Sequence, residues 1–155
     1  MPKAINSDTV ILVIEVKIIQ GDAGLKDAFE IRRRVFIEEQ NVPKELELDE
    51  MDRIASHFIL YLDKTPIGTA RLFEKDDIYY IGRMAVLKEY RGRGFGEFIM
   101  KKMMDFAKHR KINKIVLHAQ NDVVEFYKKF GFVETDNEFW EAGIKHKEMV
   151  YQFKL

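Results

Sequence analysis

The sequence predicts one α/β (α+β) domain over residues 1–155, with a mixed, mostly antiparallel sheet flanked by helices. Two observations predict this class. In the middle of the chain, strand-like segments follow one another with connections of only a few residues, and such connections join antiparallel neighbours. In the second half, strand-like and helix-like segments alternate, as in crossover units that contain a parallel strand pair. Residues 1–8 are expected to be a flexible lead-in.

The first half of the chain begins with a Val- and Ile-rich segment, Val10 to Ile19, that predicts a strand. Gly21 and Asp22 end this strand, and apolar residues at helical spacing then predict a helix from Leu25 to about Gln40. The acidic stretch after Pro43 predicts a loop or a short irregular helix. Three strands with tight turns follow, at residues 56–62, 67–74 and 78–86.

The second half of the chain changes from the strand period to the helix period. A long amphipathic helix is predicted because Phe95, Ile99, Met103 and Phe106 fall on one face. A short buried strand is predicted next, and then a second helix that Gly131 caps at its C-terminus. The remaining segments have these predicted bounds: strand 114–119, helix around residues 123–130, and strands 132–135 and 147–153.

The composition excludes several classes of protein and site. The 26 Lys and Arg residues equal the 26 Asp and Glu residues, which argues against a protein built to hold duplex nucleic acid. With no Cys there is no disulfide framework, thiolate zinc site or cysteine nucleophile. The four His residues lack the close spacing of metal ligands, so no metal site is expected.

The longest apolar run near the N-terminus contains Glu15 and Lys17. It is too short and too charged to span a membrane, and it does not resemble a signal peptide. We therefore expect a cytoplasmic protein with no membrane partner.

The run from Arg91 to Gly96 is the most informative segment, because three alternating glycines lie where a strand passes into a helix. Glycine allows a ligand to approach the backbone closely, and the N-terminus of a helix presents unpaired N–H groups to an anion. The run fits neither the P-loop pattern nor the dinucleotide fingerprint, since Glu97 stands where the latter needs glycine. A pyrophosphate cradle and an ordinary helix-entry turn with solvated arginines are both open on the glycines alone.

Two motifs together resemble the GCN5-related N-acetyltransferases, the GNAT superfamily. Arg91-Gly92-Arg93-Gly94-Phe95-Gly96 resembles that family's Q/R-x-x-G-x-G/A signature, and the segment from Phe126 to Phe132 resembles its F-Y-x-K-x-G-F motif. A narrower likeness, carried by the segments 35–40, 47–49 and 142–146, is to a subgroup of small bacterial GNAT proteins, many without an assigned acceptor. The resemblance implies a V-shaped splay between the fourth and fifth strands of the sheet.

The resemblance also implies where acetyl-CoA, the co-substrate, binds. Backbone groups of Met84 and Val86 would pair with the pantetheine arm like an added strand, and an N–H near Met84 or Ala85 would polarise the thioester carbonyl. Asn121 holds the family's position for a contact to the CoA arm, and helix capping is an equally good interpretation of this residue. The N–H groups of the following residues would hold the pyrophosphate: Arg91, Gly92, Arg93, Gly94, Phe95 and Gly96.

By the same resemblance, Tyr127 is the general acid that protonates the departing thiolate, the alternative being a core aromatic. Many relatives carry a general base just before the arginine of the fourth strand, but here that residue is Gly82, before Arg83. Glu39 and His118 are the remaining candidates for the base, and a water chain could serve instead. The ordinary interpretations are a solvated Glu39 and a satisfied buried His118.

The acidic residues between Glu45 and Asp52 also have two interpretations. They could attract a cationic amine to the mouth of the site, or they could form a solvated loop, as charge runs usually do. The solvated loop is the favoured one.

The function that follows is transfer of an acetyl group from acetyl-CoA to a primary amine of a small molecule or peptide, by direct attack. The alternative is a non-catalytic acyl-CoA-binding or sensing module of the same fold, which Gly82 keeps open. No nucleic acid partner is expected, since the Arg-Gly-Arg-Gly run is short and lacks an aromatic array. The resemblance implies a homodimer.

Overall fold

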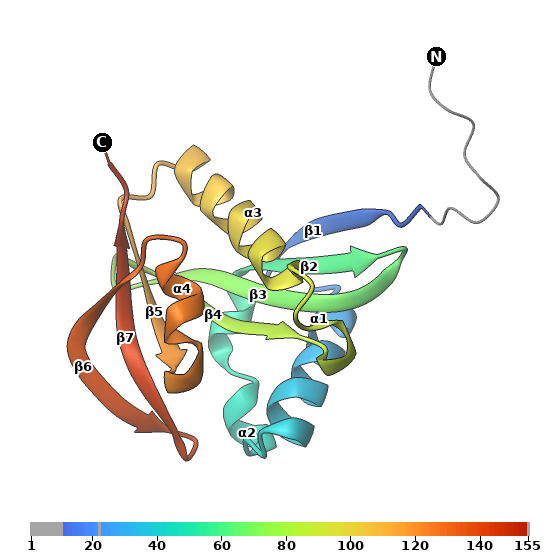
Figure 1. Cartoon of the computed structure of the whole chain (residues 1–155), viewed down its shortest axis with the longest axis horizontal. Helices are drawn as coiled ribbons and strands as arrows, with labels where there is room; N and C mark the ends of the chain where they lie inside the picture. The colour runs from blue at the N-terminus through green and yellow to red at the C-terminus, as the bar shows by residue number, and fades with distance from the viewer. Residues whose placement is uncertain (1–10, 22, 155) are drawn as a thin grey trace.

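A computed structural model describes residues 11–21 and 23–154, so the predicted flexible lead-in at 1–8 lies outside the described residues. One seven-stranded sheet runs through this part of the chain in the order β1-β2-β3-β4-β5-β7-β6 (Figure 1). All neighbours are antiparallel except β4 and β5. The strands are β1 (Ile14–Gln20), β2 (Ser56–Leu62), β3 (Thr65–Lys75), β4 (Ile78–Val86), β5 (Lys114–Gln120), β6 (Val133–Glu141) and β7 (Ile144–Gln152).

Helices cover both faces of this sheet. The longer helical elements are α1 (Lys26–Arg32), its π-helical continuation η1 (Arg33–Glu39), and α3 (Phe95–His109). The shorter ones are α2 (Lys44–Glu47), η2 (Glu50–Arg53), η3 (Lys88–Tyr90), η4 (Asn121–Val123) and α4 (Val124–Lys128). In the part of the chain that the structure describes, no helix is long and apolar enough to cross a membrane.

The fold class expected from the sequence is confirmed, and the three consecutive antiparallel strands β2, β3 and β4, a meander, agree most closely with their predicted bounds. The β2 strand has the predicted bounds, and β3 and β4 differ from theirs by two residues at most. The predicted helix from Leu25 to Gln40 is instead α1 followed by the π-helical η1, whose wider turn the apolar spacing does not reveal. The two C-terminal strands are longer than predicted, and they form a hairpin of residues 133–141 with 144–152. The sequence pattern underestimates their length because charged residues alternate along both strands and mask the strand pattern.

The N-terminal strand begins later than predicted. Its start at Val10 lies outside the described residues, residues 11–13 are not strand, and β1 starts at Ile14.

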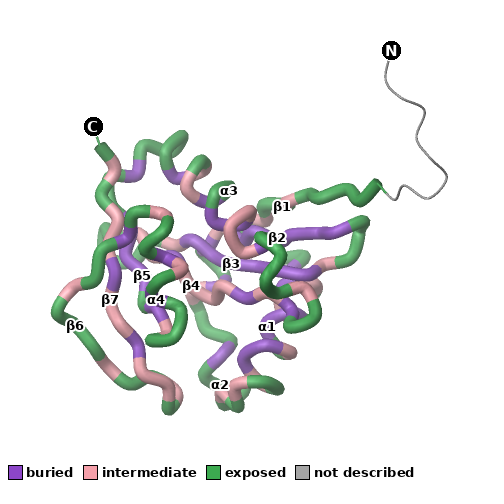
Figure 2. Tube along the Cα trace, in the orientation of Figure 1, coloured by how far each residue is buried: buried purple, intermediate pink, exposed green. Residues whose placement is uncertain are grey.

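The core has two parts, one on each face of the sheet. On one face, Ile99 and Met103 of α3 and Tyr127 of α4 pack on apolar residues of β2 to β5 and on Met149 of β7. On the other face, α1 and η1 pack through Ile31 and neighbours on β2 and β4. Figure 2 shows the buried segments concentrated in β2, β3 and β5, while β1 and β6, the two edge strands, are largely exposed.

The parallel pair β4–β5 opens partway along its length. The paired positions are Tyr79 with Ile115, Tyr80 with Val116 and Ile81 with Leu117, and the rest of each strand runs on without this partner. A β-bulge follows in β4, where Gly82 to Ala85 spans three steps against two on β3, and Arg83 adopts a φ of 52°. The mixed sheet therefore contains the splay between the fourth and fifth strands that the family resemblance implies.

Candidate functional site

The vertex of the splay lies between Gly82 on β4 and His118 on β5. These are the first residues beyond the last paired position, Ile81 with Leu117. Ile81 and Leu117 are buried in the core on the α3 side of the sheet. Because successive residues of a strand face opposite sides of the sheet, residue 82 and the ring of His118 face the other side. A side chain at residue 82 would meet only Arg71 within 4.0 Å of its Cβ, so the glycine leaves a space beside the vertex.

His118 stands within a row of aromatic rings that runs along this face. Its ring packs edge-on against Phe139 with centroids 4.8 Å apart, and against Tyr80 at 6.0 Å. Its Nε2 lies 3.9 Å from a carboxylate oxygen of Glu148, and its side chain is 39% exposed. Desolvation lowers the pKa of His118, and the negative charges of Glu141 and Glu148 oppose this only in part. The imidazole is therefore neutral near pH 7 and able to accept a proton.

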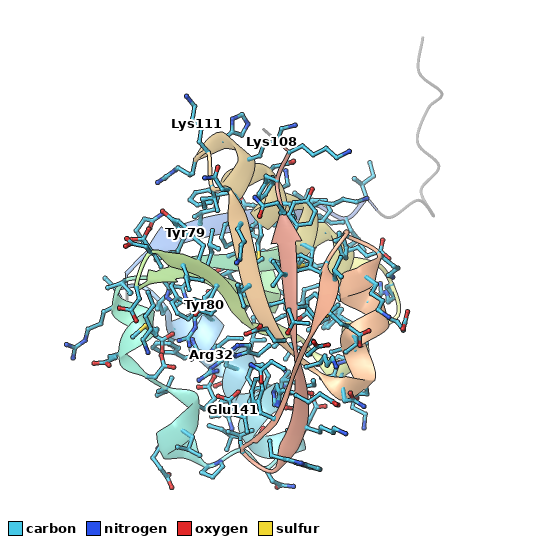
Figure 3. The ribbon with its side chains drawn as sticks, turned by 90° about the vertical axis from the view of Figure 1, so that its left-hand side faces the viewer. Arg32, Tyr79, Tyr80, Lys108, Lys111 and Glu141 are labelled. Atoms are coloured by element: carbon cyan, nitrogen blue, oxygen red, sulfur yellow. The ribbon has the colours of Figure 1, made fainter. Side chains whose placement is uncertain are left out.

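Figure 3 views the molecule from the side of these strands. Lys108 and Lys111 mark the C-terminal end of α3, and Tyr80, Arg32 and Glu141 follow one another toward the opposite end. The splayed ends of β4 and β5 thus lie at the end of the sheet remote from that basic end.

The glycine run forms the entry into α3. Gly92 and Gly94 have φ angles of 75° and 84°, which glycine adopts without the strain that a side chain would bring. Gly94 is the N-cap residue of α3, and an added Cβ at Gly92 or Gly94 would find no atom within 4 Å. The entry into the 15-residue helix is therefore open around these two glycines, as an anion cradle at a helix N-terminus requires.

Gly96 has a different role, which is close packing. Its backbone lies against Phe126 of α4, so that a Cβ at residue 96 would come within 3.3 and 3.4 Å of the Phe126 ring. Lys129 Nζ also bonds Glu97 across the same junction at 2.8 Å. The first turn of α3 is thereby fixed against α4, the two elements that carry the two sequence motifs.

The two arginines of the run are held in place by different contacts. Arg93 lies over the rings of Tyr90 and Phe95, at 5.8 and 5.4 Å from their centroids. Arg91 donates to both carboxylate oxygens of Glu39, at 2.9 and 2.8 Å, and from Nε to the Val86 carbonyl at 2.8 Å. These bonds connect Arg91 of the predicted pyrophosphate cradle to Glu39, a predicted base, and to the end of β4.

The β4 residues predicted to face the pantetheine arm lie at and after the bulge. Ala85 is buried and pairs with Thr69, and Val86 pairs with Gly68, both on the β3 side. Their other edge faces the splay from Met84 onward, where β5 no longer pairs with β4. An open strand edge is the surface that an extended ligand can extend by main-chain pairing.

Tyr127 lies in the core rather than on an exposed wall. Its ring packs edge-on against Phe126 at 5.1 Å and Phe132 at 6.2 Å, and the residue is 7% exposed. Burial raises the pKa of Tyr127 well above its ordinary value, so the hydroxyl keeps its proton at neutral pH. These contacts fit a core aromatic, and they leave the general-acid role as a prediction.

A pocket of about 570 Å³ opens at the end of β5, between the end of η1 and the β6–β7 hairpin. Gln40 and Gln120, which are 80 residues apart, exchange amide hydrogen bonds of 3.3 and 2.8 Å across it. Asn121 lines this pocket and does not cap either helical turn with its side chain. The other lining residues are Asp122, Trp140, Gly143, Ile144 and Lys145.

The acidic segment departs only in part from the expected solvated loop, because three of its five acidic residues are exposed and two are not. Glu47 and Asp52 are buried, and Arg32 bonds both, at 2.5 Å to Glu47 and 2.8 Å to Asp52. Arg71 bonds Asp49 and Asp52 at 2.6 and 2.7 Å. Glu47 and Asp52 are buried because they neutralise two buried guanidinium groups on α1 and β3, a pairing that local sequence cannot reveal.

Arg83 joins the same cluster from the bulge, with Nε donating to the Glu47 carbonyl at 3.0 Å. The bulge is therefore tied to α2. Arg71 Nε is the one buried side-chain nitrogen or oxygen within residues 11–21 and 23–154 that lacks a hydrogen-bond partner. It lies beside the space that Gly82 leaves.

Sequence reasoning missed Gln40, Gln120 and the cluster around Arg32. The one available signal was a charged residue inside an apolar pattern: Arg32 in the amphipathic helix, and Arg71 between Ala70 and Leu72. Among the described residues, no three His, Asp or Glu side chains gather as a metal site.

Known proteins match this chain over most of its length. The Acetyltransferase (GNAT) domain family matches residues 18–153. The uncharacterized N-acetyltransferase YjcF of Bacillus subtilis (strain 168) is 40% identical over 134 residues, which cover 86% of this chain and 96% of that protein. The crystal structure of Escherichia coli ElaA superposes with a TM-score of 0.80 at 25% identity, covering 89% of this chain and 99% of ElaA.

A GNAT family acetyltransferase from Elizabethkingia anophelis, solved with acetyl-CoA bound, has a similar fold. It superposes with a TM-score of 0.70 at 20% identity, covering 89% of this chain and 98% of that one.

Proposed function

The chain belongs to the GNAT acetyltransferase family, and from this premise we propose that it moves an acetyl group from acetyl-CoA to a primary amine of a small molecule or peptide. One observation carries the proposal. The open edge of β4 ends beside a glycine-lined helix N-terminus, so that one extended ligand with an anionic end could contact both. A pocket on the other side of the β5 end leaves room for the acceptor.

The residues present fit an acyl-CoA. The N–H groups from Arg91 to Gly96 would hold the pyrophosphate, with Arg91 and Arg93 adding positive charge. The free edge at Met84 and Val86 would pair with the amide-containing arm, and Asn121 would contact that arm from the end of β5. The acetyl thioester is the activated group that such a ligand supplies.

The reaction we propose needs no acyl-enzyme. The amine nitrogen attacks the acetyl carbonyl, whose oxygen takes up negative charge and accepts from a backbone N–H near Met84 or Ala85. As the carbon–sulfur bond breaks, Tyr127 donates its proton to the sulfur, and the nitrogen loses a proton to a base. The tyrosine regains a proton from solvent, so the products are the amide and CoA thiol.

We assign the base to His118 in preference to Glu39. His118 lies at the splay vertex beside the space left by Gly82, and its lowered pKa keeps it neutral. Both carboxylate oxygens of Glu39 already accept from Arg91. Glu39 and a water chain are the alternatives that substitution distinguishes.

A non-catalytic acyl-CoA-binding module is the second candidate. The observation that favours it is Gly82, where many relatives carry a carboxylate, together with the burial of Tyr127 in the core. It would bind acetyl-CoA in the same cradle and release no thiol when amines are added. The proposed setting is the cytoplasm, the proposed assembly a homodimer, and neither nucleic acid nor membrane is a proposed partner.

The test has two stages. Thermal unfolding is measured with acetyl-CoA, with free CoA and with neither; ligand at about 100 times its Kd adds roughly 2.7 kcal/mol, several degrees for a domain of this size. Thiol release is then measured with a panel of amines. A thermal shift with thiol release supports the enzyme, and a shift without release supports the binding module. No shift with millimolar ligand would refute both.

A further inference from the structure

The edge strand β1 presents apolar side chains to solvent. Among the exposed large apolar residues of the described chain, a group lies on β1 or just before it: Ile11, Leu12, Val13, Ile14 and Ile18. Ile14 and Ile18 are 42% and 45% exposed. Figure 2 shows β1 as an exposed run at the margin of the sheet, and β2 is its one strand neighbour within the described residues. An exposed edge strand that carries apolar side chains is a template for pairing with another strand.

The hydrogen bonds between β1 and β2 show which β1 residues turn their main-chain N–H and C=O groups toward the free edge. Asp63 N–H donates to the Val13 carbonyl, and Gly21 N–H donates to the Ala55 carbonyl, so odd-numbered residues of this strand bond to β2. The β1–β2 register runs without interruption from Ile14 to Gln20. Main-chain groups alternate in an antiparallel strand. The N–H and C=O groups of Ile14, Val16 and Ile18 therefore point outward.

The sequence of this edge is complementary to itself. Around Val16 the order is Ile14-Glu15-Val16-Lys17-Ile18, so a two-fold axis at Val16 places Glu15 opposite Lys17 of a second copy. Ile14 then lies opposite Ile18. The even-numbered residues, whose main-chain groups point outward, lie opposite even-numbered residues of the second copy, as main-chain hydrogen bonding between the two strands requires. Glu15 and Lys17 fall in the non-hydrogen-bonded pairs, in which opposite side chains lie closer.

Neighbouring registers lack this complementarity. An axis at residue 15 places Glu15 opposite Glu15, and an axis at residue 17 places Lys17 opposite Lys17, both of which are repulsive. An axis at residue 14 or 18 leaves each of the two charges opposite an uncharged residue. Among these registers of two copies, the charges thus favour the one with its axis at Val16.

We propose that a second copy of this chain pairs antiparallel with β1, with a two-fold axis at Val16 that joins the two sheets edge to edge. The interface is isologous, since the same surface serves both protomers. Each Ile14 covers the partner's Ile18, and each Glu15 bonds the partner's Lys17. This inference specifies the homodimer of the proposed function, and it uses neither the cradle nor the acetyl transfer.

Charge reversal tests the register directly. Lys17→Glu places two carboxylates opposite each other in each cross-strand pair, and Glu15→Lys places lysine opposite lysine, so either variant should raise the dimer Kd roughly tenfold or more. The double variant Glu15→Lys/Lys17→Glu exchanges the charges and should dimerise like the original chain. The two single variants should form a heterodimer when mixed, because each then meets the opposite charge.

The measurement is analytical ultracentrifugation of the full chain over a wide concentration range, where the dimer has twice the 18.3 kDa chain mass. Lys101→Glu on the exposed side of α3 is the matched control and should leave the mass unchanged. Circular dichroism checks that each variant folds, and acetyl-CoA binding checks the cradle separately. A monomeric original chain, or a dimer insensitive to both single reversals, would overturn the proposal whatever the outcome for acetyl-CoA.

Discussion

Gly82 and His118 are the first residues of β4 and β5 beyond the last paired position of the two strands. The glycine leaves a space beside the vertex, and the imidazole lies on the same face of the sheet as that space. This arrangement gives a reason why a chain without a carboxylate at residue 82 can still have a base at this point. Arg71 Nε, which lacks a hydrogen-bond partner among the described residues, lies beside the same space.

His118 should control the pH dependence of turnover. Because desolvation lowers the pKa of His118, the neutral, proton-accepting form prevails above a pH that lies below 6.5. We expect kcat/KM to rise through that pKa and then to level off. His118→Gln should remove this limb and lower kcat about 100-fold. His109→Gln at the exposed end of α3 is the control, and an unaltered pH profile in His118→Gln would reject the assignment.

Tyr127→Phe separates the general acid from the core aromatic. The substitution keeps the ring contacts to Phe126 and Phe132 and removes the hydroxyl. We expect kcat to fall about 100-fold, with acetyl-CoA binding and thermal stability nearly unchanged. Tyr151→Phe, on the rim of the same core, should retain full turnover. If Tyr127→Phe also does, Tyr127 is a packing residue.

Glu39→Gln should strengthen acetyl-CoA binding, because in the proposed complex Glu39 would compete with the pyrophosphate for Arg91. Both carboxylate oxygens accept from that guanidinium, and the amide can replace only part of the interaction. We expect a severalfold lower Kd by calorimetry, and a severalfold higher Kd for Arg91→Ala. Glu38→Gln frees Arg33 instead and serves as the control. A large fall in kcat with an unchanged Kd would identify Glu39 as the base.

The sequence predicts the parts of the site that are local. The meander and the α3 face follow from periodicity within short windows, and the glycine entry follows from three glycines at a strand-to-helix junction; the structure has all three close to where they are predicted. The π-helical η1 and the bulge at Arg83 are not local in this sense. Each is held by contacts to distant segments, such as the bond from Arg83 to the Glu47 carbonyl.

Pairings across the fold were likewise beyond sequence reasoning. The Gln40–Gln120 bonds join residues 80 positions apart, and either amide alone looks like an ordinary surface side chain. The burial of Glu47 and Asp52 depends on where α1 and β3 place two arginines. Charge in a sequence suggests solvation, and only the three-dimensional arrangement shows that it is neutralised.

Asp52 should make the free energy of unfolding fall at acid pH. Burial alone would raise the pKa of Asp52, but the hydrogen bonds and charges of Arg32 and Arg71 outweigh it and hold this pKa at about 2. Protonation thus favours the unfolded chain. This part of the stability is present above about pH 4 and is lost as the pH falls toward about 2.

Asp52→Asn leaves two buried guanidinium groups short of a carboxylate. We expect it to cost roughly 3–5 kcal/mol in the free energy of unfolding at pH 7, measured by urea titration, and to flatten the acid dependence. Glu38→Gln removes an exposed ion pair and should cost under about 1 kcal/mol. Equal losses in the two variants would contradict this account.

Gly96→Ala tests whether close packing of α3 on α4 fixes the cradle. The new Cβ would come within 3.3 Å of the Phe126 ring, and no positive φ is involved, so the effect is steric. We expect a severalfold higher Kd for acetyl-CoA, because the first turn of α3 must shift. Phe126→Leu should restore binding in the double variant by shortening the opposing side chain. Gly94→Ala is the contrast: its Cβ meets nothing, but its φ of 84° adds strain of about 1–2 kcal/mol that Phe126→Leu cannot relieve. Rescue of both alanine variants, or of neither, would show that contact with Phe126 does not position the cradle.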